Sequence, residues 1–314
     1  MNFPVFDFHC DTALALLGEN YRSSGSLRRN NGHIDLERAS KLAGYAQCFA
    51  CFTTTLYKDL PAVDVFEREL ATILREIENN SDKIRQAYTA EDVAQNLEDG
   101  MMSAILTIEG PAGFGFDPAL LEDLYNVGFR VTTLGWNESN ILTGSHITKE
   151  GLSNQGREYV KEAQRLGMII DVSHISDQGF YDIMDITQAP VIATHSNSRF
   201  VHDVSRNVTD DMFQQICKTG GLVGINQYAD FLGEQPNLDT ICDHVVHFAE
   251  LDPDVKHIAL GADFDGCDAL AEGVTGIESY PALAQRLLER GFTDEQVNNI
   301  FWNNAVGVMK QCCI

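Results

Sequence analysis

The chain has 314 residues, of which 44% are apolar and 22% are charged, a composition typical of a globular protein with a large buried core. Forty-six acidic residues against 22 basic ones give a net charge of -24 at pH 7, which repels phosphate backbones and anionic lipid surfaces. We therefore expect no nucleic acid and no membrane among its partners.

Cellular location and thiol state are predicted from the apolar segments and the cysteines. No apolar stretch approaches the roughly 20 residues that span a bilayer, and the first strand-like run begins close to Met1, so a secretory leader has no room. We expect a cytoplasmic protein with reduced thiols. Cys48 and Cys51 lie at opposite parity in one strand-like run and are expected to pack in the core. Cys312 and Cys313 are expected to be exposed in a C-terminal tail.

Short apolar runs of strand length recur along the chain. They are Phe3 to Phe8, Tyr45 to Phe52, Ala104 to Ile108, Phe129 to Leu134, Met168 to Val172, Val191 to Ala193, Leu222 to Asn226 and His257 to Leu260. Segments with helical periodicity lie between most of them, such as Val63 to Ile77 and Gly156 to Leu166. Alternating strands and helices indicate an α/β protein with a parallel sheet, and eight such repeats match a (β/α)8 TIM-like barrel. Without a linker-like tract, residues 1–314 are expected to form a single domain.

A doubly wound open sheet is the alternative architecture. It typically carries a G-x-G-x-x-G sequence after its first strand, and none follows Phe8. The glycine-rich segment Gly110 to Gly115 lacks the Lys-Ser/Thr of a phosphate-binding loop. The candidate ligands also follow several different strands, which favours the barrel.

The first metal-binding candidates follow the first strand. His9 and Asp11 are two residues apart, so in an extended chain both point to one face while Cys10 points to the other. A His-x-Asp pair alone is more often structural. Its position at the end of strand one, where barrel enzymes place their active sites, favours chelation of one cation.

Three further candidates, Glu109, His174 and His195, each close a later apolar run. A lone glutamate commonly pairs with an arginine or caps a helix, and a lone buried histidine is commonly a hydrogen-bonded core residue. At the ends of separate strands of one barrel they would instead converge on one pocket. A bridging carboxylate and two imidazoles then favour a second cation.

The last apolar run leads to Asp263 and Asp265, which are expected to share one face. Such a pair is able to brace a turn or bind Ca²⁺, but beside an activated water one of the two suits a proton shuttle. Arg206 follows the sixth run. It pairs either with surface acids or bidentately with a substrate carboxylate.

Six other histidines carry weaker signals. Three are interpreted as structural, because two lie on a predicted helix and one lies at the opposite end of the last strand: His244, His247 and His257. Three lie in predicted loops within reach of the pocket: His33, His146 and His202.

These motifs together resemble those of the renal (membrane) dipeptidase family of the amidohydrolase superfamily. The resemblance runs nearly from end to end of the chain. It rests on His9-Cys-Asp11, Gly-Tyr-Ala-Gln-Cys-Phe in the second run, Ile-Glu109-Gly, Asp-Val-Ser-His174, Ala-Pro-Val-Ile-Ala-Thr-His195-Ser, Ser-Arg206-Asn-Val and Gly-Ala-Asp263-Phe-Asp-Gly.

The resemblance implies a dipeptidase with two divalent ions, with Zn²⁺ as the preferred metal. The implied ligands are His9, Asp11 and Glu109 for one ion and Glu109, His174 and His195 for the other. A hydroxide shared by the ions would attack the peptide carbonyl of small free dipeptides, L,L and L,D substrates being considered. Asp263 would pass the proton to the leaving amine and Arg206 would hold the terminal carboxylate. A homodimer is compatible with the sequence.

Two departures from the family concern substrate contact and location. Mammalian members carry a substrate-contacting histidine after strand four, where this chain reads Thr-Leu-Gly-Trp136-Asn-Glu, as in the bacterial branch. Trp136 is therefore expected to wall the substrate pocket, and His146 is a candidate replacement for that histidine. We expect no counterpart of the leader and lipid anchor of the mammalian enzymes, and therefore no membrane localisation.

Two other functions stay open. A different amidohydrolase, such as a lactonase or deaminase, commonly uses a carboxylated lysine at the end of strand four, where this chain has no lysine before Lys149. A catalytically silent barrel that binds metal or peptide needs no proton shuttle such as Asp263. The sequence favours the dipeptidase over both.

Overall fold

The computed structural model describes residues 3–18, 24–58 and 60–313. Its strands belong to one sheet and are β1 Val5–Cys10, β2 Tyr45–Phe52, β3 Ile84–Gln86, β4 Met102–Glu109, β5 Phe129–Thr133, β6 Ile169–Asp171, β7 Val191–Ile192, β8 Val223–Ile225 and β9 Ile258–Leu260. The order is β7-β6-β5-β4-β2-β1-β9-β8, and β3 pairs with β4. All of these pairings are parallel. Each of the eight apolar runs overlaps a strand, whereas the short β3 was not predicted.

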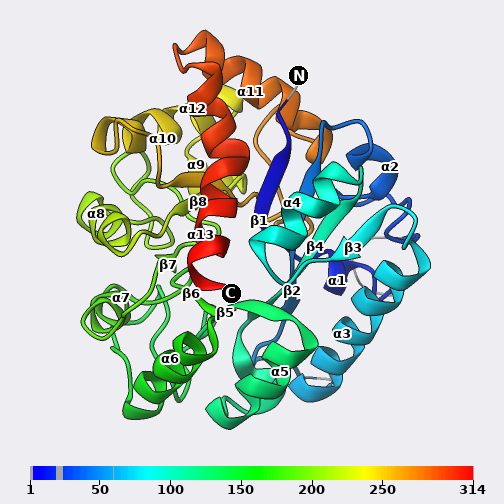
Figure 1. The fold of residues 1–314 in the computed structure, drawn as a ribbon. Helices are drawn as coiled ribbons and strands as arrows, with labels where there is room; N and C mark the ends of the chain where they lie inside the picture. Colours follow the sequence, from blue (N-terminus) through cyan, green and yellow to red (C-terminus); the bar gives the residue numbers. More distant parts are fainter. Residues whose placement is uncertain (1–2, 19–23, 59, 314) are drawn as a thin grey trace.

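The two ends of this strand order meet, so the sheet closes into the predicted barrel (Figure 1). Ala193, directly after β7, forms a parallel bridge with Val223 of β8, and its N–H donates to the carbonyl of Leu222 at 3.0 Å. A Cβ atom at Gly224 or Gly261 would lie 2.0 or 1.7 Å from the carbonyl oxygen of Thr194. Only glycine permits this approach of the backbones, which completes the barrel.

Helices alternate with the strands and form a ring around them (Figure 1). They are α1 Thr12–Ala15, α2 Leu36–Ala39, α3 Ala62–Asn79, α4 Ala90–Glu98, α5 Leu121–Val127, α6 Asn154–Leu166, α7 Asp177–Met184, α8 Asp210–Thr219, α9 Ala229–Leu232, α10 Leu238–Leu251, α11 Tyr280–Glu289, α12 Asp294–Asn298 and α13 Asn304–Cys312, with short 3₁₀ or π segments Pro111–Phe114, Pro118–Leu120, Ile277–Ser279 and Asn299–Asn303. The predicted helices lie inside α3 and α6. In the described part of the chain, no helix has the length and apolarity that crossing a membrane requires.

The interior of the barrel is filled by apolar side chains from the strands and from α13. Phe6, Phe8 and Cys48 belong to this inner cluster together with Met309, whereas Cys51 belongs to the outer cluster between strands and helices. Cys48 and Cys51 therefore face opposite ways in the core, as expected.

The expectation that Cys312 and Cys313 are exposed is wrong. They are 6% and 1% exposed, because α13 continues to Cys312 and packs both residues against the inner cluster. Figure 1 shows α13 lying across the barrel, where it covers one end. The cavity described below opens where the strands end. It is lined by residues that follow β1, β5, β6, β8 and β9, together with Glu109, the last residue of β4.

Candidate metal centre

A bulge in β1 turns His9 toward the centre of the barrel. Asp7 pairs with Gln47 and Cys10 pairs with Phe49, so three steps along β1 match two along β2. The N–H of His9 is satisfied by the side chain of Asp7, whose Oδ1 atom accepts it at 3.0 Å. A bulge breaks the alternation of side chains, which is why both Phe8 and His9 face inward.

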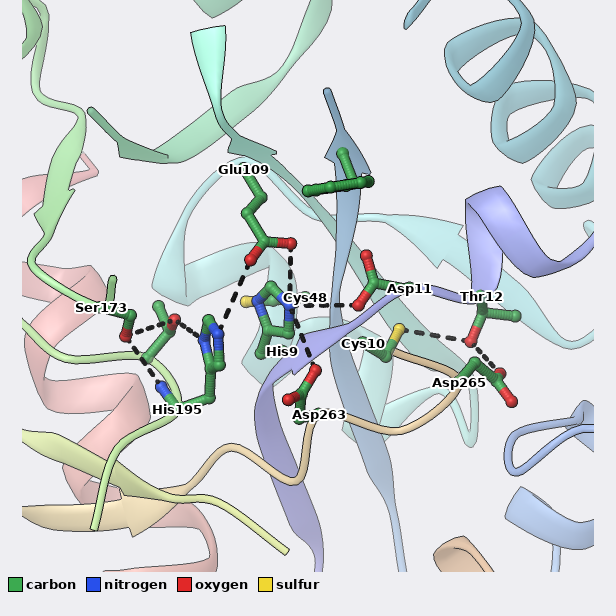
Figure 2. Close-up of polar contacts among 12 residues, drawn as sticks. His9, Cys10, Asp11, Thr12, Cys48, Glu109, Ser173, His195, Asp263 and Asp265 are labelled. Atoms are coloured by element: carbon green, nitrogen blue, oxygen red, sulfur yellow. Dashed lines mark hydrogen bonds and ion pairs between the residues drawn. The ribbon is translucent and has the colours of Figure 1, made fainter. Parts of the chain in front are cut away.

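His9 and Asp11 form the first part of the centre. The Nε2 atom of His9 lies 3.4 Å from Oδ2 of Asp11 and 3.3 Å from Oε2 of Glu109. His9 and Asp11 are both buried, at 2% and 5% exposure. Figure 2 shows the two side chains converging below Glu109. The structure thus brings together the pair that the sequence placed on one face.

Glu109 lies between two sets of histidines. While its Oε2 atom faces His9, its Oε1 atom lies 2.9 Å from Nε2 of His174 and 3.7 Å from Nε2 of His195. The chain turns sharply after this last residue of β4, because Gly110 has a φ of 77° and a Cβ atom there would lie 2.1 Å from the Thr53 carbonyl. The carboxylate therefore presents one oxygen to each side.

His174 and His195 direct their Nε2 atoms at each other and at Glu109. The two Nε2 atoms are 2.9 Å apart. The Nδ1 atom of His174 lies 2.8 Å from Oδ1 of Asn137, and the Nδ1 atom of His195 lies 2.6 Å from Oγ1 of Thr194. Hydrogen bonds at both Nδ1 atoms leave the Nε2 atoms as the ligand positions.

The side chains of this centre fit divalent cations. Three overlapping groups place one ligand atom per residue within 4.8 Å of the others: His9, Asp11 and Glu109; Glu109, His174 and His195; and His9, His195 and Asp263. Two of the buried atoms, Nε2 of His9 and Oδ1 of Asp11, have no hydrogen-bond partner. Buried polar atoms without partners are rare, and imidazole nitrogen with carboxylate oxygen is a donor set that zinc accepts.

The electrostatics agree with that fit. Burial raises the pKa of Glu109 to about 7 and, together with nearby Arg206, holds the pKa of His174 well below its ordinary value. Burial opposes the charging of His9 as well, but the charges of Glu109 and Asp11 outweigh it and hold the pKa of His9 well above its ordinary value. Buried carboxylates that face the neutral imidazoles of His174 and His195 are stabilised by a cation between them.

Asp263 lies at the edge of this cluster, and Asp265 turns away from it (Figure 2). The Oδ1 atom of Asp263 is 3.9 Å from Nε2 of His9, and its Oδ2 atom accepts a hydrogen bond from Nδ2 of Asn226 at 3.2 Å. The carboxylate of Asp265 instead accepts from Oγ1 of Thr12 and the N–H of His33 at 2.7 Å each.

The expectation that Asp263 and Asp265 share one face is therefore wrong. β9 ends at Leu260, so strand alternation does not extend to them. Both residues have positive φ, 64° and 65°, and the loop sends their carboxylates to different partners.

Arg206 is buried beside the two later histidines. Its Nη2 atom donates to the carbonyl of His195 at 3.2 Å and lies 3.1 Å from Nε2 of His174. Its guanidinium lies over the ring of Phe231, 5.2 Å from the ring centre, and its Nε atom is buried without a partner. Phe231, unlike Arg206, is among the residues that line the cavity over the centre.

A cavity of about 440 Å³ lies over the cluster. Its lining is acidic near the centre and apolar or aromatic around it, and consists of Asp11, Leu14, Ala15, Phe52, Glu109, Trp136, Asn137, His174, Tyr228, Phe231, Asp263, Asp265, Gly266, Cys267 and Asp268. Trp136 thus lies on the cavity wall, with its ring centre 5.0 Å from that of Phe52. The volume suits a small ligand of a few residues at most.

His146 lies behind His174 and does not line this cavity. Its Nε2 atom is 3.0 Å from Oδ1 of Asn137, the same oxygen that faces His174. Its Nδ1 atom is 2.9 Å from Oγ of Ser205. His146, which was expected to contact the substrate, therefore supports Asn137 instead.

Three of the other histidines were interpreted as structural: His244, His247 and His257. Each contacts residues outside the ligand cluster. His244 accepts from the N–H of Ser198 and faces the carbonyl of Leu232, and His257 lies 2.6 Å from the carbonyl of Gly221. His247 pairs with Asp210 at 2.8 Å. The loop histidines His33 and His202 lie outside the lining of the cavity.

Several lining residues were not singled out from the sequence. Phe52 has a signal, because it ends β2 in register with Glu109. Asn137 adjoins Trp136, but no sequence pattern marks it as a residue that lines the cavity. Tyr228 and Phe231 come from the segment after β8, and no local pattern marks which of its aromatic residues turn toward the cavity.

A closed parallel barrel with imidazole and carboxylate ligands converging at the ends of its strands defines a TIM-like barrel of the metal-dependent hydrolase type. The chain belongs to the membrane dipeptidase family, peptidase family M19, whose model matches residues 1–313.

Relatives and solved structures agree with this assignment. An uncharacterized dipeptidase of Schizosaccharomyces pombe is 34% identical over 67% of this chain, and the chain spans 53% of that protein's length. A dipeptidase of Clonostachys rogersoniana is 31% identical over 98% of this chain and 83% of its own. A metallopeptidase of Rhodobacter sphaeroides, solved with a phosphinate mimic of the dipeptide L-Ala-D-Ala, is 25% identical, with a TM-score of 0.88 over 99% of this chain and 100% of its own.

Proposed function

We propose that this protein is a metal-dependent dipeptidase that hydrolyses small free dipeptides with two divalent ions, preferably Zn²⁺. The observation that carries the proposal is Glu109, whose two oxygens face His9 on one side and His174 on the other. Family membership supports the same activity, and so does the dipeptide mimic bound by the Rhodobacter sphaeroides metallopeptidase.

The proposed ligands are those that the cluster groups together: His9, Asp11 and Glu109 for one ion, and Glu109, His174 and His195 for the other. A pair of divalent ions supplies a water of lowered pKa and polarises the scissile carbonyl. The side chains of the chain itself then have to position the dipeptide, move a proton and keep bulk water out.

Asp263 is proposed to move the proton from the attacking water to the leaving amine. Its Oδ1 atom lies at the edge of the ligand cluster, and the amide of Asn226 holds its other oxygen. Burial raises the pKa of Asp263 to about 6, close to neutral pH, which suits a group that both accepts and donates a proton.

Arg206 is proposed to bind the terminal carboxylate of the dipeptide. Its Nη2 atom lies 3.1 Å from Nε2 of His174, the atom proposed as a ligand. When that nitrogen binds an ion, Nη2 loses this partner and, with the unpartnered Nε atom, is available to a carboxylate. A guanidinium binds a carboxylate with two parallel hydrogen bonds, which favours free dipeptides over amides.

Two pairs of aromatic residues that line the cavity are proposed to hold the substrate side chains: Trp136 with Phe52, and Tyr228 with Phe231. Apolar walls around a polar centre are usual for small-molecule sites. Both L,L and L,D dipeptides are proposed as substrates. A cytoplasmic location, a homodimer and the extent of the single domain remain predictions from the sequence.

The test is a turnover screen of L,L and L,D dipeptides with the zinc-loaded protein, alongside the corresponding dipeptide amides, a lactone and an aminopyrimidine. We expect hydrolysis of free dipeptides that a chelator abolishes and added zinc restores. Hydrolysis of the lactone or deamination of the pyrimidine without dipeptide turnover would establish a different amidohydrolase. Zinc binding without any turnover would establish a binding protein.

A further inference from the structure

The imidazole of His195 is supported by a carboxylate through an intervening hydroxyl group. Its Nδ1 atom lies 2.6 Å from Oγ1 of Thr194, and that Oγ1 atom donates to Oδ2 of Asp171 at 2.6 Å. All three residues are at most 1% exposed, so water does not compete for these contacts. The chain Asp171, Thr194, His195 ends at the Nε2 atom that faces Glu109 at 3.7 Å.

The direction of these hydrogen bonds follows from what each group can donate. A carboxylate only accepts, and Asp171 also accepts the N–H groups of Ser173 and Thr194 on its Oδ1 atom at 2.9 Å each. The single hydroxyl hydrogen of Thr194 therefore points to Asp171. One of the two lone pairs of this oxygen faces His195, so Nδ1 of His195 carries the hydrogen and Nε2 carries the free lone pair.

Thr194 cannot easily leave this position. Its backbone N–H is bound to Asp171, and its carbonyl oxygen is packed against the Cα positions of Gly224 and Gly261, where a Cβ atom would lie within 2.0 Å of it. The strand closure that completes the barrel thus also fixes the hydroxyl. A group held in this way is preorganised for its partner.

The other histidine on this side is supported differently. Nδ1 of His174 faces the neutral amide oxygen of Asn137 at 2.8 Å. The direct acceptor of His195 is also a neutral oxygen, but the hydroxyl group of Thr194 donates to Asp171 and is thereby polarised into a stronger acceptor. A stronger acceptor at Nδ1 makes the imidazole a stronger metal ligand. His174 and His195 are therefore unequal ligands, and the asymmetry originates in Asp171 and Thr194.

We propose that Asp171 and Thr194 are positioning residues that fix the tautomer of His195 and strengthen the binding of the cation held by Glu109, His174 and His195. This inference rests on the proposed function only in taking a divalent cation to occupy that group of ligands. Neither residue touches substrate in the proposal. Replacing either residue is expected to lower the affinity of the protein for one of the two ions.

The test compares the wild type with Thr194→Val, and Thr194→Ser with Thr194→Ala. In each pair, one member has the hydroxyl group and the other lacks it. Thr194→Val keeps the branched shape of the wild-type residue and removes the hydroxyl, while Thr194→Ser and Thr194→Ala both lack the methyl and differ in the hydroxyl. Thr132→Val is the matched control, since Thr132 is equally buried on β5 and bonds to Tyr159, away from the ligands. The probe is zinc alone, titrated into the metal-free full chain against a competing chelator, with elemental analysis of the bound metal.

Loss of a group that supports a ligand typically lowers metal affinity by about 10- to 100-fold. We expect a loss of this size for one of the two ions in Thr194→Val and in Thr194→Ala, with Thr194→Ser and Thr132→Val close to the wild type. In histidine-labelled, zinc-loaded protein, the Nδ1–H signal of His195 is expected to lose its protection from solvent in Thr194→Val.

The inference is overturned if Thr194→Val and Thr194→Ala each bind both ions as tightly as their hydroxyl-bearing counterparts. If Thr194→Val does not fold, the Ser and Ala pair decides alone. A wild-type protein that binds no zinc would overturn the proposed function and this inference together, whereas normal binding in every variant overturns only the inference.

Discussion

The Nε2 atoms of His174 and His195 lie 2.9 Å apart, although the Nδ1 atom of each ring is already hydrogen-bonded to a different partner. Burial holds the pKa of both imidazoles well below the ordinary value, so two lone pairs face each other across a buried gap. Repulsion of this kind is relieved by a cation.

Replacement of Glu109 is expected to disturb both ions. The purified protein should hold close to two divalent ions per chain when zinc is in excess, and Glu109→Ala should retain fewer than one, because this carboxylate faces both groups of ligands. Elemental analysis measures the content. Glu69→Gln is the matched control, a buried glutamate whose Oε2 atom accepts the N–H of Phe52 instead. A wild-type content of one ion or less would rule out the binuclear centre.

Metal affinity is expected to fall below about pH 7. Burial raises the pKa of Glu109 to about 7 in the metal-free protein, and a cation requires the deprotonated carboxylate. Protons on Glu109 therefore compete with the cation below that pH, in addition to the proton on His9, whose pKa is held well above its ordinary value. Displacement of one proton corresponds to roughly a tenfold loss of affinity per pH unit. Chelator competition at a series of pH values measures this, and an affinity that stays constant from pH 7 to pH 5 would contradict the assignment.

Asp263→Asn is expected to lower kcat by at least about 100-fold, the scale of general acid–base catalysis, and to keep the metal content close to normal. Asp265→Asn is the matched control. Its carboxylate is bound to Thr12 and His33, so the loss should appear in stability and leave kcat within a few-fold of the wild type. Loss of both ions in Asp263→Asn would make this residue a ligand, and full activity would move the proton transfer elsewhere.

Arg206 and the substrate carboxylate are expected to act as one pair. Hydrogen bonds to charged groups contribute about 1.5 to 3 kcal/mol, so Arg206→Ala should lower kcat/KM by roughly 10- to 150-fold for a free dipeptide. An amidated dipeptide should show a similar loss with the wild-type enzyme. The two changes combined should cost little more than either alone. If the two losses of kcat/KM instead add in full, Arg206 and the substrate carboxylate are not in contact.

Glu69→Gln is expected to change the pH dependence of stability. Burial holds the pKa of Glu69 well above its ordinary value, and its Oε1 atom has no partner. A raised pKa in the folded state means that stability is greatest at low pH and is lost as the pH rises. The stability of the variant relative to the wild type should therefore rise from pH 5 to pH 8, because the amide of glutamine does not ionise.

Unfolding by denaturant at both pH values measures this difference. Glu67→Gln, an exposed position on the same helix, serves as the control and should stay within about 0.5 kcal/mol of the wild type at either pH. A stability difference between Glu69→Gln and the wild type that stays constant from pH 5 to pH 8 would contradict a raised pKa of the buried carboxyl group.

The barrel and the five ligand-type residues were predictable because the signals are local. An apolar run of strand length that ends in His9, Glu109, His174 or His195 can be seen in a few residues, and parallel strands in a barrel bring their ends together. The buried faces of α3 and α6 were predictable for the same reason, since helical periodicity lies within one segment.

For residues outside the regular alternation of strands and helices, the tertiary structure alone determines where the side chains point. The bulge in β1 turns His9 inward, the positive φ angles of Asp263 and Asp265 separate two carboxylates that a strand would align, and His146 is directed to Asn137 instead of the cavity. The first position depends on the pairing of β1 with a distant segment, β2, and the others depend on loop conformations with no repeating pattern. Residue types and strand ends thus specified which atoms meet at the centre, and long-range packing specified which way each side chain near it points.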